Sequence, residues 1–306
     1  MSVDYIKSLS QRLEFSREAT TFLVATSTKI HQYSCTNSFY TKAIKAYVES
    51  NYEIQAVENI LKLLSKTINL PYYSVLQIFF MELAEKLETR YYDANYDEKL
   101  FINTISDLKY RMLECKDIHG VYGNAAPWWY GNIFRMELFG IGRFQYKEKS
   151  YVGESLLVCG HAIKSGERVI DIHIPSNCGA IDIETRYESY RRAYEFFCKH
   201  GKVDRIFVCK SWLLWPSYEA SFKFSKNITS FRNDFKLIQP IPTPSFDNAW
   251  RIFGREYEKS ISYWPRKTAL QKSLAEYCEN GGLHGLGYGF FVFDGNVILN
   301  RPKEIK

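Results

Sequence analysis

The chain has 306 residues, of which 46% are hydrophobic and 24% charged, a composition typical of a globular protein of one large or two ordinary domains. Its 40 basic and 34 acidic residues leave a net charge of +6 with no block of like charges and no nucleic-acid motif, so we expect no nucleic-acid partner. No apolar run reaches the ~18 residues that a membrane span requires, and the first residues lack a signal-peptide pattern. We expect a soluble, cytoplasmic protein with no membrane partner and an undetermined oligomeric state.

The seven cysteines indicate reduced thiols. Their number is odd, and they form no CxxC or CxxH pair, so neither a disulfide framework nor a zinc site is expected. We predict that the protein holds no metal. The cysteines are Cys35, Cys115, Cys159, Cys178, Cys198, Cys209 and Cys278.

The first part of the chain has the apolar spacing of helices. Stripes at helical spacing run over residues 54–68, over 76–87 after Pro71, and over 100–112, where Lys116 to Gly120 supply a helix end. This pattern predicts a helical N-terminal domain over residues 1–140. We interpret His31 and Cys35 in it as packing residues rather than ligands.

The pattern changes after about residue 120, and the second part alternates strands with helices. Period-two alternation predicts strands at 143–147 and 169–174, and Asp182 is a natural N-cap for a helix that ends near Gly201. A strand at 206–209 follows, then helices at 211–220, 247–257 and 268–277. Apolar runs on both sides of Asp294-Gly295 predict a C-terminal hairpin.

This order defines the expected fold class. A strand, a helix and a second strand imply a right-handed crossover with parallel pairing, and the hairpin makes the sheet mixed. We therefore predict an α+β protein, in which a helical N-terminal domain is followed by an α/β domain over residues 141–306 with a mixed sheet and a C-terminal hairpin.

Polar side chains end the two predicted parallel strands. His173 closes the first strand, and Cys209 and Ser211 close the next. Because adjacent parallel strand ends meet at one edge of a sheet, these residues are candidates for a general base and a nucleophile, or for a simple hydrogen-bonded pair. His173 could instead bond to backbone at its strand end, and Ser211 could simply cap the next helix. No acidic residue has a spacing that indicates a Ser-His-acid triad.

Five segments carry a family resemblance over about the last 165 residues. In order, they are Ile141 to Tyr146, His173 to Pro175, Cys209 to Leu214, Lys226 to Ile228 with Phe231, and Arg266 to Gln271. The chain resembles a bacterial family of uncharacterised acyltransferases, built from an N-acyltransferase N-terminal domain and a GNAT-like C-terminal domain.

The resemblance implies where acyl-CoA would bind. In GNAT folds a strand splays from its neighbour and pairs with the pantetheine arm, and the following loop and helix N-terminus hold the pyrophosphate. By this likeness Ile174, Ser176, Asn177, Gly179 and Asp182 would bind CoA. Acetyl-CoA or another acyl-CoA would then be the co-substrate.

The resemblance also suggests further catalytic roles, and the sequence departs from the family in two places. Tyr218 could act as an acid toward the departing thiolate, with His173, Cys209 and Ser211 completing the candidate catalytic set. The usual GNAT phosphate-loop signature is absent, and Trp215 stands where the family typically has an acidic residue.

Two functions follow. The first is transfer of an acyl group from acyl-CoA to a small amine by direct attack. The second is a catalytically degenerate GNAT-fold module that binds an acyl ligand or a protein partner. An open gap between the strands ending at His173 and Cys209 would favour the enzyme, and a gap plugged by Trp212 or Trp215 would favour the module.

Overall fold

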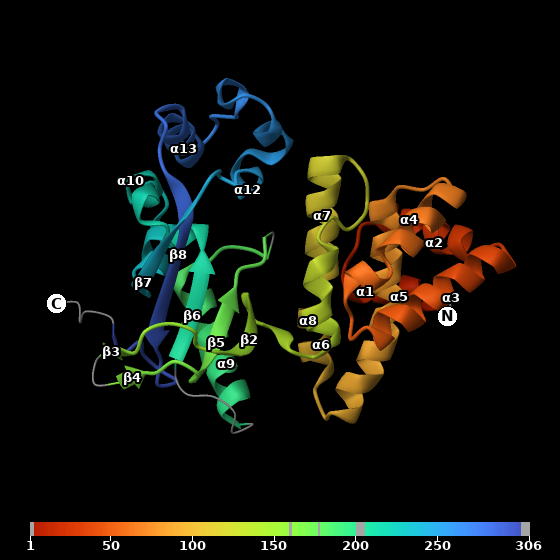
Figure 1. Ribbon diagram of the computed structural model, residues 1–306, viewed down its shortest axis with the longest axis horizontal. Coiled ribbons are helices and arrows are strands. Elements are labelled where there is room, and N and C mark those ends of the chain that lie inside the picture. Colours follow the sequence, from red (N-terminus) through yellow and green to blue (C-terminus); the bar gives the residue numbers. More distant parts are fainter. Residues whose placement is uncertain (1–2, 159–160, 177, 200–205, 301–306) are drawn as a thin grey trace. The chain divides into compact units, whose positions relative to one another are not determined.

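The computed structural model describes residues 3–158, 161–176, 178–199 and 206–300, and the chain divides into two compact units, Met1–Gly140 and Ile141–Lys306. The first unit is drawn from red to yellow in Figure 1 and the second from green to blue. Cys159 and the candidate CoA-binding residue Asn177 lie outside the described residues. None of the helices in the described segments is long and apolar enough to span a bilayer.

The first unit is helical, as predicted, and residues 50–115 contain no strand. Its longest helix, α5, is buried along most of its length, and Gly120 ends α7 in the left-handed conformation that glycine favours. The third predicted stripe is split into two helices that meet at Ser106. The helices are α1 Val3–Arg12, α2 Arg17–His31, α3 Ser34–Glu49, α4 Glu58–Thr67, α5 Tyr72–Asp93, α6 Glu98–Ile105, α7 Asp107–His119 and α8 Tyr130–Phe134.

The second unit is built on a mixed six-stranded sheet in the order β1-β2-β5-β6-β8-β7. β5 and β6 are parallel, whereas β2 pairs with β5, β6 with β8 and β7 with β8 in antiparallel fashion. The strands are β1 Leu138–Ile141, β2 Phe144–Ser150, β5 Arg168–His173, β6 Ile206–Ser211, β7 Lys236–Thr243 and β8 His284–Val292. The mixed sheet confirms the predicted fold class. β3 Leu156–Val158 and β4 His161–Ile163 form a separate two-stranded ribbon.

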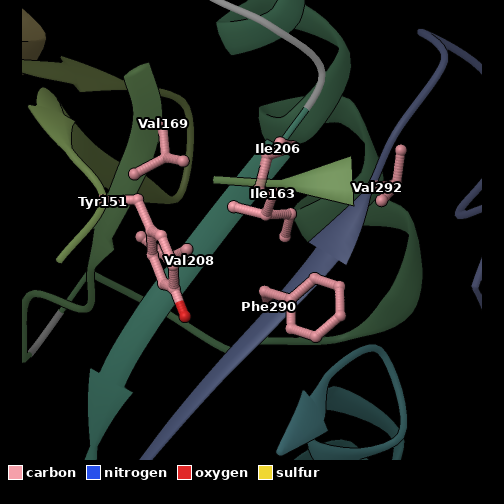
Figure 2. Packing of buried hydrophobic residues seen from close by; sticks show 7 residues of the cluster. All are labelled: Tyr151, Ile163, Val169, Ile206, Val208, Phe290 and Val292. Atoms are coloured by element: carbon pink, nitrogen blue, oxygen red, sulfur yellow. The ribbon is translucent and has the colours of Figure 1, made fainter. Parts of the chain in front are cut away.

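Alternation along the strands gives the sheet two different apolar faces. Figure 2 shows one face, where Val169 of β5, Val208 of β6 and Phe290 of β8 pack with Ile163 of β4 and with Tyr151. On the other face, Tyr190 of α9 (Ile183–Lys199) packs on Phe207 and Phe291, with ring centroids 6.2 and 4.8 Å away. α9 is the predicted crossover helix, and Asp182 caps it by accepting a hydrogen bond from the Thr185 backbone N–H at 2.9 Å.

A buried ion pair fixes the start of α9. Arg186 is fully buried and donates from Nε to Asp234 Oδ2 at 2.6 Å and from Nη2 to Ser230 Oγ at 2.7 Å. Its Nη1 donates to the Ile181 carbonyl at 3.3 Å. Ser230 lies in α11 (Lys226–Arg232), so this guanidinium joins α9, α11 and the loop that precedes α9.

Three glycines at every second position of β8 leave room for the turn that follows β6. A methyl group on Gly285 would meet the Trp215 ring at 2.5 Å, and one on Gly287 would collide with the carbonyl group of Leu214. The turn is η3 (Trp212–Leu214), and it runs on into η4 (Pro216–Tyr218) and α10 (Glu219–Phe222). The helix predicted at 211–220 is therefore divided into three short helices, because the chain turns as it packs on these glycines.

The last elements agree with the predictions only in part. α13 (Ala269–Glu279) begins at a capping box between Thr268 and Gln271. The helix predicted at 247–257 is a short α12 (Trp250–Phe253) followed by η5 (Gly254–Glu258). The predicted C-terminal hairpin has its turn, closed by a bridge between Phe293 and Ile298, but no second strand forms among the described residues.

The glycine strip of β8 generates a graded test. Gly287→Ala places a methyl group against backbone and should lower the free energy of unfolding by roughly 2 kcal/mol, within the range for overpacking. A methyl group on Gly289 would come no closer than 3.1 Å to its neighbours, Phe235 Cβ, Leu214 Cδ1 and the Lys236 carbonyl oxygen, so Gly289→Ala should cost less. Urea unfolding of both variants measures the difference. A Gly287→Ala protein as stable as Gly289→Ala would contradict this packing.

Candidate functional site

The pairing between β5 and β6 stops before β6 ends. The last parallel partners are Ile172 and Cys209, while β6 continues through Lys210 and Ser211, which pair only with β8. Beyond Cys209 the edge of β6 that faces β5 has no strand partner in the described part of the chain. An unpaired strand edge offers N–H and C=O groups to an extended ligand.

Neither tryptophan named as a possible plug has its ring contacts at β5. Trp215 donates from Nε1 to the Leu283 carbonyl at 2.8 Å and packs on Gly285 at the start of β8. The Trp212 ring lies 5.7 Å from Phe222 and 5.5 Å from Phe246. Both rings thus pack with the α10 and β8 side of the unit.

The structure does not bring His173 together with Cys209 and Ser211 on one face. Parallel partners share a face, so Cys209 lies on the face of Ile172, which is the α9 face. Ser211, two residues on, also lies on that face. His173 follows Ile172 and points to the opposite face, with Asp171 and Val169. The structure therefore places His173 on one face and Cys209 and Ser211 on the other, because side chains alternate along a strand and His173 is one residue beyond the partner of Cys209.

His173 lies at the exposed end of its face within a set of charged groups. Its side chain is 30% exposed, and Nε2 lies 3.4 Å from Oδ2 of Asp171. Burial lowers the pKa of His173 below its usual value, Asp171 opposes this shift, and Lys149 and Lys147 add to it. The ring is therefore neutral at pH 7 and has a lone pair that accepts a proton.

The surroundings of Cys209 and Ser211 favour structural roles over catalytic ones. Cys209 is 1% exposed, and burial raises the pKa of its thiol far above the normal value, so the reactive thiolate does not form at neutral pH. Ser211 Oγ accepts a hydrogen bond from the Leu213 N–H at 3.2 Å. Ser211 is thus the N-cap of η3, the second of its two predicted roles.

Tyr218 belongs to a different cluster at the same end of the sheet. It is fully buried, and its hydroxyl lies 2.9 Å from Nδ1 of His284, the first residue of β8. Burial raises the pKa of Tyr218 and lowers that of His284. A buried hydroxyl bonded to a neutral imidazole is poorly placed to protonate a thiolate, and the geometry gives Tyr218 a packing role.

The loop between β5 and α9 is held by an arginine that the sequence analysis did not identify. Arg143 is 7% exposed, and its Nε donates to the carbonyls of Gly179 at 3.0 Å and Ala180 at 3.1 Å. Its Nη1 donates to the Pro175 carbonyl at 3.1 Å. These bonds fix the course of the loop, in which Ile174 and Ser176 are half-buried and Gly179 has a positive φ of 83°.

Asp182 already accepts a hydrogen bond from a backbone N–H group in the first turn of α9. Its carboxylate accepts from the backbone N–H and the hydroxyl of Thr185, and these bonds lower its pKa. A negative charge thus occupies the place where the resemblance puts a phosphate. A pocket of about 440 Å³ opens here, lined by Gly142, Arg143, Cys178, Glu184, Thr185 and Glu188. Its two glutamates would also repel a phosphate.

Two further site residues, Asp171 and His284, were missed. Alternation along the predicted strand places Asp171 on the same face as His173, but Asp171 was not among the predicted site residues. His284 had no comparable signal, because its partner Tyr218 is distant in sequence. Across the described segments, no group of three His, Cys, Asp or Glu side chains is arranged to hold a metal ion.

Family comparisons agree with this architecture. The family described as the GNAT-like C-terminal domain matches residues 138–291, and the N-acyltransferase N-terminal domain matches residues 4–136. The chain belongs to this acyltransferase family, in which an N-acyltransferase N-terminal domain precedes a GNAT-like C-terminal domain. Curated proteins give no match.

Solved structures share the fold at low sequence identity. An acyltransferase in complex with decanoyl-CoA and teicoplanin is 17% identical, with 95% of this chain and 87% of that chain covered and a TM-score of 0.69. An acyltransferase mutant in complex with octanoyl-CoA is 16% identical, with 95% and 88% covered and a TM-score of 0.72. An acyltransferase in complex with CoA and 10C-teicoplanin is 16% identical, with 92% and 86% covered and a TM-score of 0.70.

The cysteine environments predict very different reactivities. Cys35 is exposed, whereas Cys209 and Cys115 are buried. Burial raises the pKa of both buried thiols, to about 12 for Cys115 and further for Cys209. Under native conditions a thiol reagent should label Cys35 at least a hundredfold faster than Cys209, because only the thiolate reacts. Mass-spectrometric mapping over time measures this ratio. Rapid labelling of Cys209 in folded protein would reinstate it as a candidate nucleophile.

Proposed function

We propose that this protein transfers an acyl group from acyl-CoA to the amine of a small-molecule acceptor by direct attack, with His173 as the general base. The observation that carries the proposal is the end of β5–β6 pairing at Ile172 and Cys209, with His173 at the margin of the resulting gap. In the proposed complex an extended pantetheine arm would lie there as an added strand, hydrogen-bonded to the edge of β6. The thioester carbonyl would then lie near the ends of both strands.

Direct attack is favoured over a covalent acyl-enzyme. The buried thiol of Cys209 and the capping hydroxyl of Ser211 are both on the face opposite His173, so neither has the base that would activate it. A neutral imidazole at the end of β5 instead suits deprotonation of an incoming amine, directly or through water. As the C–N bond forms and the C–S bond breaks, the amine proton passes to His173, and the imidazolium then gives this proton to the CoA thiolate, which restores the neutral ring.

Acyl-CoA is the proposed donor, and its chain length is part of the test. The similar structures hold decanoyl-CoA and octanoyl-CoA, which supports a longer donor alongside acetyl-CoA. One of them also holds teicoplanin, so a larger amine-bearing acceptor belongs in the assay beside small amines. A thermal-shift series with acetyl-, octanoyl- and decanoyl-CoA and free CoA tests binding, since a ligand at a hundred times its Kd adds about 2.7 kcal/mol of stability.

A binding module without turnover is the second candidate. Arg143 holds the loop carbonyls and Asp182 holds a negative charge at the start of α9, which leaves this loop without an evident phosphate site. Stabilisation by acyl-CoA with no CoA released in the presence of amines would favour the module.

His173→Ala should reduce turnover about a hundredfold or more, the usual effect of removing a general base, while the melting temperature changes little because the ring lies at a strand end. The readout is release of free CoA thiol with saturating acyl-CoA and amine. His119→Ala, which removes an exposed histidine at the end of α7, is the matched control and should behave as the parent. Full activity in His173→Ala would remove His173 from the mechanism.

The pH dependence of turnover should follow the lowered pKa of His173. The basic form is populated above that pKa, so kcat should be level near pH 7 and should fall only as the pH drops below about 6.5, the ordinary histidine value. The acid limb should disappear in His173→Ala. An acid limb centred above pH 7 in the parent protein would show that another group is the base.

A further inference from the structure

A buried carboxylate connects His173 to a lysine on the neighbouring strand. Asp171 is 8% exposed, and its Oδ2 lies 2.8 Å from Lys149 Nζ and 3.4 Å from His173 Nε2. All three side chains lie on one face, because Lys149 pairs with Val169 across β2 and β5, and Val169, Asp171 and His173 alternate on that face. The lysine, the carboxylate and the imidazole therefore form one row, and His173 is its end at the margin of the gap.

The other oxygen of this carboxylate is unsatisfied. Asp171 Oδ1 is buried and has no hydrogen-bond partner. A buried acceptor without a partner costs free energy, so its presence in the folded protein calls for an explanation. Burial of the ion pair between Asp171 and Lys149 costs desolvation free energy, so a gain in stability alone does not account for its position.

We propose that Asp171 is the positioning residue for His173, and that it holds the ring with its proton on Nε2 so that Nδ1 receives the proton of the attacking amine. This inference rests on the proposed acyl transfer. Nε2 faces the carboxylate, so Nδ1 is on the side of the ring away from Asp171. A carboxylate that accepts from one imidazole nitrogen fixes which tautomer is present and leaves the other nitrogen basic.

The charges facing His173 keep it a base rather than an acid. Asp171 comes from its own strand, and Lys147 and Lys149 come from β2. On the β8 side, the Tyr288 ring lies 5.3 Å from Lys149 Nζ. Lys149 neutralises Asp171, so the carboxylate orients the ring without converting it into a permanently charged imidazolium.

The test reads His173 directly by nitrogen-15 NMR of the imidazole rings of the full chain, with its signals assigned from their loss in His173→Gln. We expect the Nε2-protonated tautomer in the parent. Asp171→Asn should erase that preference and lower the His173 pKa, because the opposing negative charge is gone. Lys149→Met should raise the His173 pKa, because a nearby cation is gone. Lys236→Met removes an equal charge from exposed β7 and should leave His173 unchanged.

Kinetics supply the second readout. Asp171→Asn should lower kcat at least tenfold with little change in the KM for acyl-CoA, as for a misoriented base. An unchanged tautomer and pKa in Asp171→Asn, or an undiminished kcat, would overturn the inference. If Asp171→Asn does not fold, the His173 pKa in Lys149→Met decides, and no rise there overturns it. The NMR result is independent of turnover, so failure of the acyl-transfer proposal is recognised separately, by full activity in His173→Ala.

Discussion

The structure of the second unit depends on where the pairing of β5 with β6 ends. Up to Ile172 and Cys209 the two strands are part of one sheet with apolar side chains on both faces, and the α9 crossover makes them parallel. Beyond that point β6 continues against β8 alone. The glycine strip of β8 supports this, because it lets η3 pack closely on β8 where β6 ends. The candidate site lies where β6 stops pairing with β5 and continues against β8 alone.

The two faces at this edge have different chemistry. On the α9 face, a buried thiol and a capping hydroxyl serve the fold, and the network of Arg186 with Asp234 fixes the start of α9. On the opposite face, a neutral imidazole is placed among one carboxylate and two lysines. Only the second set can move a proton at neutral pH, which is why the proposed mechanism uses a base and no enzyme nucleophile.

Local signals predicted the elements well. The Asp182 cap, the helix expected from Thr268 and the Gly120 helix end all formed, because each depends on a few residues adjacent in the chain. The helical first unit and the mixed sheet followed from apolar periodicity. The C-terminal turn formed, but up to Asn300, where the described residues end, no second strand follows it, since the dipeptide Asp294-Gly295 specifies a turn and not the strand that pairs after it.

The site was predicted less well because it depends on register. Strand order correctly placed His173, Cys209 and Ser211 at one edge, but which face each side chain takes depends on the parallel pairing of Ile172 with Cys209, which no local pattern encodes. Arg143 was missed for a similar reason, since its three carbonyl partners are 32 to 37 residues further along the chain. The sequence pattern was searched for phosphate-binding residues within the loop between β5 and α9. In the structure this loop is held by Arg143, next to the start of β2, which donates hydrogen bonds to its carbonyl groups.

The central claim is that acyl-CoA binds in the gap between β5 and β6. A crystal structure with a non-transferable thioether analogue of decanoyl-CoA tests it most directly. The account predicts pantetheine amide groups hydrogen-bonded to the β6 edge beyond Cys209, with the carbon that replaces the thioester carbonyl within reach of the His173 ring. An analogue bound elsewhere, with this gap filled by protein side chains, would contradict it.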